Sequence, residues 1–362
     1  MTRNFYTLFL FIFCCSFTAL AYSNNKTENS KEDDFDVNET IMHHIKDSHD
    51  FHILDWNGHP VSVPLPVILW TNEGLVAFMS SEFHHDDSGA TVVKRKNQAF
   101  VKFHEEIYYA GNDKEGKYIQ LDSSNHPIND KPLDLSITKL VFSMFLSIII
   151  IFIIFILSAK SYARSKKGEP SGLGKFTEPI IIYIRDEVAL PLIGEEKHEK
   201  YLPFLLTIFF FIWINNLMGM IPFFPFSANL SGNIAFTGVL ALITFVITTL
   251  VSNKHYWKHI FWMPGIPVPM KLFMAPIEFL GIFIKPLSLM IRLFANISAG
   301  HIIVLSLISL IFIFKSIWVA PASLLFSVFI SLIEVLVVAI QAYIFTMLSA
   351  LYIGSAMEEQ EH

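Results

Sequence analysis

The sequence predicts an all-α integral membrane protein with about five transmembrane helices, the last two forming a long, strongly tilted hairpin, and a small extracytoplasmic N-terminal region. Of the 362 residues, 53% are hydrophobic and 35 are phenylalanine, and the mean hydropathy of +0.49 is too high for an ordinary soluble domain. Several uncharged runs are long enough to cross a hydrocarbon core of about 30 Å as helices. The net charge of -6 gives no basic excess to neutralise phosphates, so nucleic acid is not an expected partner.

The first apolar run follows Arg3 and ends in a small-x-small triplet at residues 19–21. This pattern predicts a signal peptide over residues 1–21, cleaved after Ala21. An uncleaved anchor helix is the alternative, because the run is borderline in length for a span. Cleavage would remove Cys14 and Cys15, the two cysteines of the chain, and with them disulfide and thiol chemistry.

Residues 22–139 hold most of the charges and nine of the 14 histidines, and we expect them outside the cytoplasm. Short strands separated by Gly, Asn and Asp turns are indicated by "HPVSVPLPVILWT", "GLVAFMSS", "ATVVKRKNQAFVKF" and "KYIQL". The spacing of His44, His49 and His52 is compatible with a metal, but there is no H-E-x-x-H pattern, so a solvated surface is favoured and no metal or cofactor is predicted. A proton-collecting role for these histidines is a hypothesis motivated only by their number.

The uncharged run at 140–157 is the first predicted transmembrane helix, and the charges after it set its orientation. Residues 158–200 begin with five basic residues against one acid, which places this loop in the cytoplasm by the positive-inside rule. The later part of the loop mixes apolar and charged residues and is broken by Pro179 and Pro191. We therefore expect it to form a helix lying at the membrane interface.

Four further apolar segments follow, at 201–221, 234–251, 273–314 and 322–353. The last two exceed the ~20 residues that one perpendicular crossing needs, so a strong tilt is expected for both. An odd number of crossings places the tail at 354–362 in the cytoplasm. We see no internal repeat of the kind that inverted-repeat transporters carry.

Few polar side chains interrupt the last two segments: Glu278, Lys285, Arg292, Asn296, His301, Glu334 and Gln341. At 3.6 residues per turn, Arg292 and Asn296 share a face, His301 lies about half a turn away, and Glu334 and Gln341 share a face of the last helix. An arginine at mid-membrane costs from about 3 to 10 kcal/mol or more, so it must meet a partner or water.

Arginine stays protonated at any accessible pH, whereas His301 and Glu334 can exchange protons. A fixed charge beside titratable groups indicates a proton pathway with an electrostatic barrier. The structural alternatives are an Arg292 that snorkels to the interface and a His301 that is a hydrogen-bonded core residue.

The segments "NNLMGMIP", "PIEFLGIFIKPLSLMIRLFANISAGH" and "IEVLVVAIQAYIFTMLSALYIGSA" resemble subunit a of the F-type ATP synthase, over about residues 137–359. In that family this subunit is the membrane stator against which a ring of c subunits turns. The resemblance implies that Arg292 faces the carboxylate on each c subunit and blocks direct proton leakage between two half-channels.

The resemblance also assigns the neighbouring polar residues. Asn296 and Gln341 match polar positions beside the arginine, and Glu278 and Asn216 match other channel-lining positions. His301 and Glu334 match a coupled pair in the half-channel open to the outside, with acid and histidine exchanged between the two helices relative to some members. Gly219 stands where some members carry an aspartate, so no channel carboxylate is expected there.

The implied partners are the c-subunit ring, the peripheral stalk b subunits, the remainder of the ATP synthase complex and the lipid bilayer of a bacterial inner membrane. The chain has no G-x-x-x-x-G-K-[ST] pattern, so nucleotide chemistry must lie on other subunits and this chain is not by itself an enzyme for nucleotide. Protons are favoured over sodium because His301 and Glu334 titrate. Two rivals are a proton-coupled secondary transporter, which would need an internal repeat, and a structural assembly protein with a buried ion pair.

Overall fold

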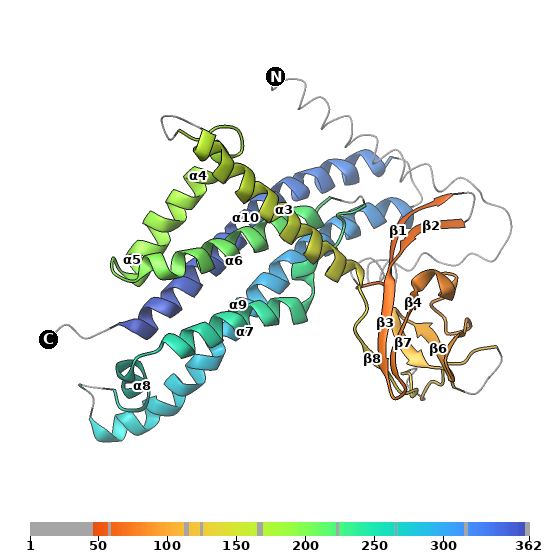
Figure 1. The fold of residues 1–362 in the computed structure, drawn as a ribbon, viewed down its shortest axis with the longest axis horizontal. Helices are drawn as coiled ribbons and strands as arrows, with labels where there is room; N and C mark the ends of the chain where they lie inside the picture. The colour runs from red at the N-terminus through yellow and green to blue at the C-terminus, as the bar shows by residue number, and fades with distance from the viewer. Residues whose placement is uncertain are drawn as a thin grey trace. The chain divides into compact units, whose positions relative to one another are not determined.

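The computed structural model describes residues 46–56, 59–111, 116–123, 126–164, 169–221, 224–263, 265, 267–314 and 318–358. The expected signal peptide at 1–21 and His44 lie outside these ranges. The described residues divide into two compact units, a β-rich module over Ser48–Thr138 and a helical unit from Lys139 onward (Figure 1). Each unit is described by itself.

The β-rich module is built of three small antiparallel sheets. β1 (Asp50–Trp56) pairs with β2 (His59–Pro64). A second sheet has the order β4-β3-β8, with β3 at Pro66–Thr71, β4 at Gly74–Met79 and β8 at Leu133–Asp134. The third has the order β5-β6-β7, with β5 at Val93–Arg95, β6 at Gln98–Phe103 and β7 at Glu106–Tyr109, and a short 3-10 helix η1 (Ser80–Phe83) follows β4.

Alternation along the strands creates the core of this module. In β3 the side chains of Val67 and Leu69 are buried while Trp70 is exposed, as a sheet with one covered face requires. The buried side chains of β3 and β4 form one cluster with residues of the third sheet, among them Phe100 and Ile107. The prediction of a β-rich region is therefore confirmed for the described residues.

The segment "KYIQL" is not a strand, contrary to expectation. Its residues make only isolated bridges, such as Leu121 with Pro127, and backbone bonds to separate segments, such as the amide of Tyr118 donating to the carbonyl of Gly89. The amide of Gln120 donates to the side-chain oxygen of Asn129 at 2.7 Å, and the Asn129 side chain donates in turn to the carbonyl of Tyr118. A side chain thus takes the place of a neighbouring strand, and alternating apolar residues do not reveal this.

The helical unit contains five helices that are long and apolar enough to cross a membrane: α3 (Lys139–Arg164), α6 (His198–Gly219), α7 (Ile234–Val251), α9 (Val268–Ile313) and α10 (Ala320–Met357). This number fits the predicted five spans. Shorter elements stand between them: α4 (Gly174–Tyr183), the π-helical η2 (Ile184–Ala189), α5 (Leu190–Ile193), η3 (Leu230–Gly232) and α8 (Lys254–Phe261). The tilt of α9 and α10 in a bilayer stays a prediction.

The core of this unit forms where α6, α9 and α10 pack together, and residues such as Leu205, Leu293 and Ala342 are fully or almost fully buried there. α10 approaches its neighbours closely because it presents small residues, as membrane helices commonly do. At Gly354 a Cβ atom would overlap the carbonyl oxygen of Leu192 in α5, so this position has no room for a side chain.

Candidate functional site

α9 and α10 bring two predicted site residues together. Nδ1 of His301 lies 3.4 Å from Oε1 of Glu334, and Glu334 is only 6% exposed. Gly300 makes room for this carboxyl group, because a Cβ atom there would lie 2.9 Å from Oε1 of Glu334. The helical period placed His301 on the side of α9 opposite to Arg292, and in the structure Glu334 of α10 faces it there.

The helices that carry the pair also carry buried hydroxyl groups. The hydroxyls of Ser298 on α9 and Ser327 on α10 have no hydrogen-bond partner among the described residues, and neither has Oε1 of Glu334. Unsatisfied polar groups in an apolar interior cost several kcal/mol each, so these atoms need water or another partner. Ser323 is satisfied, since its hydroxyl donates to the carbonyl of Leu307 at 2.5 Å and ties α10 to α9.

Arg292 lies on the other side of α9. The residues that flank its turn, Leu289 and Leu293, are buried in the helical core, whereas Arg292 is half-buried and Asn296, one turn later, is exposed. Among the described residues Arg292 has no hydrogen bond or ion pair. Arg292 and Asn296 therefore share a face, as predicted, and no bond links that face to the pair of His301 and Glu334.

Gln341 is buried on α10, two turns beyond Glu334, and is 7% exposed. The structure gives it no bond to Arg292 in the part of the chain that it describes. Further along the same helix, the hydroxyl of Ser349 lies 3.5 Å from that of Thr244 on α7. Polar groups thus continue along α10 within the packed unit.

Glu278 lies near the beginning of α9, beside α8. Burial, with a smaller contribution from the carboxylate of Glu278, raises the pKa of Tyr256 on α8. Tyr256 and Lys285 line a small cavity of about 20 Å³ with Tyr352 and three threonines, Thr244, Thr248 and Thr249. This volume suffices for a water molecule.

Asn216 is buried at the end of α6, 2% exposed, and neither its side-chain oxygen nor its nitrogen has a partner among the described residues. Gly219 follows one turn later, where a Cβ atom would lie 3.0 Å from the carbonyl oxygen of Ala228. The backbone therefore occupies the space that an aspartate would need, in agreement with the expectation of no carboxylate there.

Sequence reasoning missed several buried polar groups of this region. Asn215, Asn229, Ser231 and Ser298 each have a buried side-chain atom without a partner in the described part of the chain. The only sequence signal for Asn215 was its place beside a second asparagine at the end of an apolar run. Isolated serines are too common in membrane helices to indicate a site.

The metal-compatible histidine spacing has another explanation at His49. This residue is 3% exposed, and its Nε2 lies 3.1 Å from Oδ2 of Asp134. Burial favours the neutral form of Asp134, but hydrogen bonds from His49 and Ser136 outweigh it and lower the pKa of that carboxyl. The described residues contain no group of three or more His, Cys, Asp or Glu side chains that could hold a metal ion.

A family model described as ATP synthase A chain matches residues 141–354, which is more than half of the chain and contains every residue of the site above. The chain belongs to the ATP synthase A chain family. It is 42% identical over 235 residues to ATP synthase subunit a of Chloroherpeton thalassium, covering 63% of this chain and 69% of that one. It is 39% identical over 323 residues to ATP synthase subunit a of Chlorobium phaeobacteroides strain DSM 266, covering 83% and 93%.

Membership of the ATP synthase A chain family, together with the five long apolar helices, makes this chain a multi-pass membrane protein. A second family model, described as a domain of unknown function (DUF8433), matches residues 40–135. That range coincides with most of the β-rich module. The module is therefore a recurrent domain, and its match is separate from that of the helical unit.

Proposed function

We propose that this chain is the proton-conducting stator subunit of the F-type ATP synthase, and that its helices form two half-channels against a ring of c subunits. Proton flow would then be coupled to rotation of the ring and to ATP synthesis on other subunits. The observation that carries the proposal is the pair of His301 and the buried Glu334. His301 lies on the side of α9 opposite to the fixed charge of Arg292, half a turn around the helix axis.

The pair supplies the group that can take up and release protons. Imidazole and carboxyl groups exchange protons readily when they lie within reach of each other or of a bridging water. At 3.4 Å the two atoms are in reach, and the free hydroxyls of Ser298 and Ser327 offer sites for ordered water. Buried ionisable residues in membrane helices commonly mark such proton paths.

Arg292 supplies the barrier. A guanidinium group cannot lose its proton at accessible pH, so it cannot pass one on. At 4 Å and an effective dielectric constant of about 20, it would stabilise a facing carboxylate by about 4 kcal/mol. Its exposed surroundings include the small Ala295 and Ala299, which would let another helix approach closely. The family resemblance makes that helix one of the c ring.

The order of groups along α9 supports two separate paths. The basic residues near α8 predict that α9 starts on the cytoplasmic side. On a helix that rises 1.5 Å per residue, Glu278 lies about 21 Å before Arg292, and His301 about 14 Å after it. We therefore place Glu278 in the cytoplasmic path and His301 in the outer one, with Asn216 on the outer side because α6 runs outward.

The free energy available from each proton explains why a barrier against leakage is needed. Each elementary charge that moves through 100 mV releases about 2.3 kcal/mol, so several protons are needed for each nucleotide and a leak past the barrier would be wasteful. Asn296 and Gln341 would hold water or orient groups near the arginine. We propose a bacterial inner membrane as the location, with the N-terminal module outside, the C-terminus in the cytoplasm, and b subunits of the peripheral stalk as further partners.

The decisive experiment replaces Arg292 by alanine in the assembled complex and measures ATP-driven proton pumping in vesicles. We expect pumping to be abolished, with a passive leak through the membrane sector. Arg185→Ala is the matched control, since Arg185 is exposed and bonded to the adjacent Asp186 outside the long helices. Normal pumping by a well-assembled Arg292→Ala complex would show that the arginine is only structural.

A further inference from the structure

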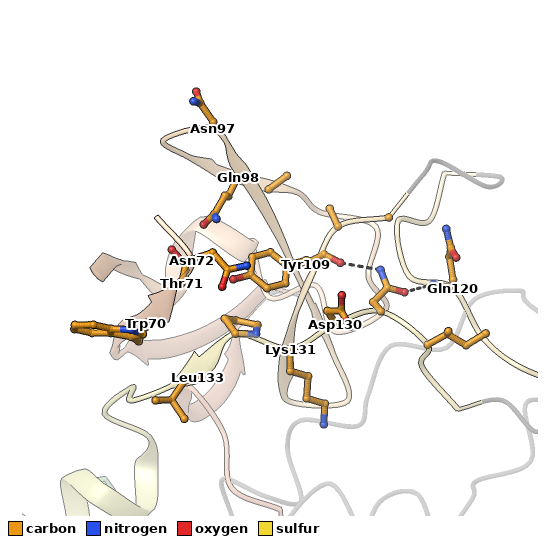
Figure 2. Close-up of a pocket in the computed structure, with 16 residues that line it drawn as sticks. Trp70, Thr71, Asn72, Asn97, Gln98, Tyr109, Gln120, Asp130, Lys131 and Leu133 are labelled. Carbon is orange, nitrogen blue, oxygen red and sulfur yellow. Dashed lines mark hydrogen bonds between the residues drawn. The ribbon is translucent and has the colours of Figure 1, made fainter. Parts of the chain in front are cut away.

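A large cleft lies within the β-rich module and shares no residue with the site above. It has a volume of about 1060 Å³, and all of its lining residues belong to this module. Figure 2 shows Trp70 at one end of the lining and Gln120 at the other, with Asn72, Gln98 and Tyr109 close together between them. The volume is at the upper limit of typical small-molecule sites, which suits an extended ligand rather than a compact one.

Amide side chains dominate the polar lining. Asn129 is used by the protein, since it binds the carbonyls of Tyr109 and Tyr118 and the amide of Gln120. Gln98 is different: its side-chain oxygen is buried and has no hydrogen-bond partner among the described residues. An amide oxygen in that position needs a donor, which a ligand in the cleft would supply.

Other groups converge without partners. The side chain of Asn72, the hydroxyl of Tyr109 and the carboxylate of Asp130 have no hydrogen bond in the described part of the chain, and all three line the cleft. The ring of Tyr109 is held in place by the core, with its centroid 5.4 Å from that of Phe100. These groups offer donors and acceptors to a ligand in the cleft, and the Tyr109 ring among them is held by packing.

The described residues that line the cleft offer no free cation to an anionic ligand. Lys131 extends away from the centre of the lining in Figure 2, and its ammonium group donates to Glu106 at 2.5 Å and lies 4.9 Å from the ring centroid of Tyr108. The hydrogen bond to Glu106 raises the pKa of Lys131, so this charge is already paired. Phosphorylated or carboxylate ligands are therefore disfavoured.

Trp70 adds an apolar surface at the end of the cleft. It is 57% exposed on β3, a large exposed fraction for a tryptophan side chain. An exposed indole beside amide and carboxylate groups presents an apolar face and a polar edge together. A sugar ring has the matching chemistry, with C–H groups on its face and hydroxyls on its rim that both donate and accept.

We propose that this cleft binds a neutral oligosaccharide, with one sugar ring on Trp70 and hydroxyl or acetamido groups bound by Asn72, Gln98, Tyr109 and Asp130. The β-rich module would then attach the chain to a carbohydrate polymer outside the membrane. The inference is independent of the proton pathway, because no residue of the cleft takes part in it.

The test uses the full chain in lipid nanodiscs, which avoids detergents that carry sugars. Isothermal titration calorimetry with tetra-N-acetylchitotetraose and with cellotetraose would detect binding and show whether acetamido groups contribute. We expect at least one to bind with a millimolar or tighter Kd, and Trp70→Ala to weaken binding at least tenfold. Gln98→Met, which keeps the size of the side chain, should weaken it several-fold.

The matched control is Trp318→Ala, which removes another exposed tryptophan, 87% exposed and outside the module. It should bind as the unaltered chain does. Absence of binding by both tetrasaccharides at about 10 mM would overturn the proposal. Unchanged affinity in Trp70→Ala or in Gln98→Met, with an unchanged melting temperature, would overturn it as well.

Discussion

Gly300 provides the sharpest test of how the buried pair is positioned. In Gly300→Ala the new Cβ atom would lie 2.9 Å from Oε1 and 3.0 Å from Cδ of Glu334, whereas ordinary contacts begin at 3.4 Å. The carboxyl group must therefore retreat by about 0.5 Å, which changes its distance of 3.4 Å from Nδ1 of His301, to at most about 3.9 Å. The side chain is flexible at this end, so the change alters the pair more than the fold.

The expected effect is a three- to tenfold loss of proton flux. Holding Glu334 about 30° off its preferred rotamer costs about 0.5 to 1.5 kcal/mol, and each 1.4 kcal/mol added to a barrier slows a step about tenfold. Helix α9 itself should gain stability, because alanine is favoured over glycine by up to about 1 kcal/mol inside a helix. A loss of flux would therefore not reflect a weakened helix.

The assay is passive proton flux through the membrane sector in vesicles, followed with a pH-sensitive dye under an imposed potential. Gly281→Ala is the control on the same helix, since a Cβ atom at Gly281 meets nothing within 4 Å. The control should conduct normally. If Gly300→Ala assembles and conducts as well as the control does, the close contact at Glu334 has no role in conduction.

Three further predictions concern packing and pH. Gly354→Ala should lower the free energy of unfolding of the helical unit by about 1 to 3 kcal/mol, because the methyl group overlaps the carbonyl of Leu192. The unfolding temperature and the yield would fall with it. Asp134→Asn should destabilise the β-rich module by about 1 kcal/mol at pH 7, measured by hydrogen exchange, since it weakens the bond to His49. The pKa of Asp134 is lowered in the folded state, so this difference should begin to shrink below about pH 4, near the unfolded pKa, and be lost as the pH falls through the lower folded pKa. Ser323→Ala should cost about 1 kcal/mol, seen as easier thermal unfolding, because it removes the bond that joins α10 to α9.

Neighbouring residues provide controls for two of these. Ser355→Ala, next to Gly354, removes an exposed hydroxyl that bonds only within its own helix, so it should change stability little. Asp122→Asn alters an exposed carboxylate 3.8 Å from His126 and should have a small effect. A Gly354→Ala protein as stable as Ser355→Ala would contradict the close packing of α5 on α10. An Asp134→Asn difference that stays the same from pH 7 down to the acid unfolding of the module would contradict the pKa argument.

The sequence predicted those features correctly that depend on a single helix. Uncharged runs and basic flanks predicted five long helices, and the period of 3.6 residues predicted that Arg292 and His301 lie on different sides of α9. The partner of His301 depends on the register between two helices, and no single helix fixes that register. The resemblance, rather than the periodicity, paired it with Glu334.

The sequence could not predict which glycines lie against another helix, because that also depends on the register between helices. Gly300 and Gly354 look alike as small residues in apolar helices, yet one faces a carboxyl group and the other a backbone carbonyl. The missed strand at "KYIQL" has a similar cause, since the side chain of Asn129 supplies the bonds that a strand would have made. In each case the deciding atom belongs to a residue far away in the sequence or on another element.

The lack of an intrachain partner for Arg292 among the described residues fits a stator better than a structural ion pair. A carboxylate of the same chain would neutralise the guanidinium permanently and remove the field that a passing rotor group must meet. The titratable pair instead lies on the opposite side of α9, where Nδ1 of His301 is 3.4 Å from Oε1 of Glu334. His301 lies half a turn around α9 and about 14 Å along its axis from Arg292, and Glu334 is close to His301 rather than to the guanidinium. Under the proposed function, this arrangement would leave the charge of Arg292 available to a carboxylate of the c ring that arrives, is ionised beside it and leaves again.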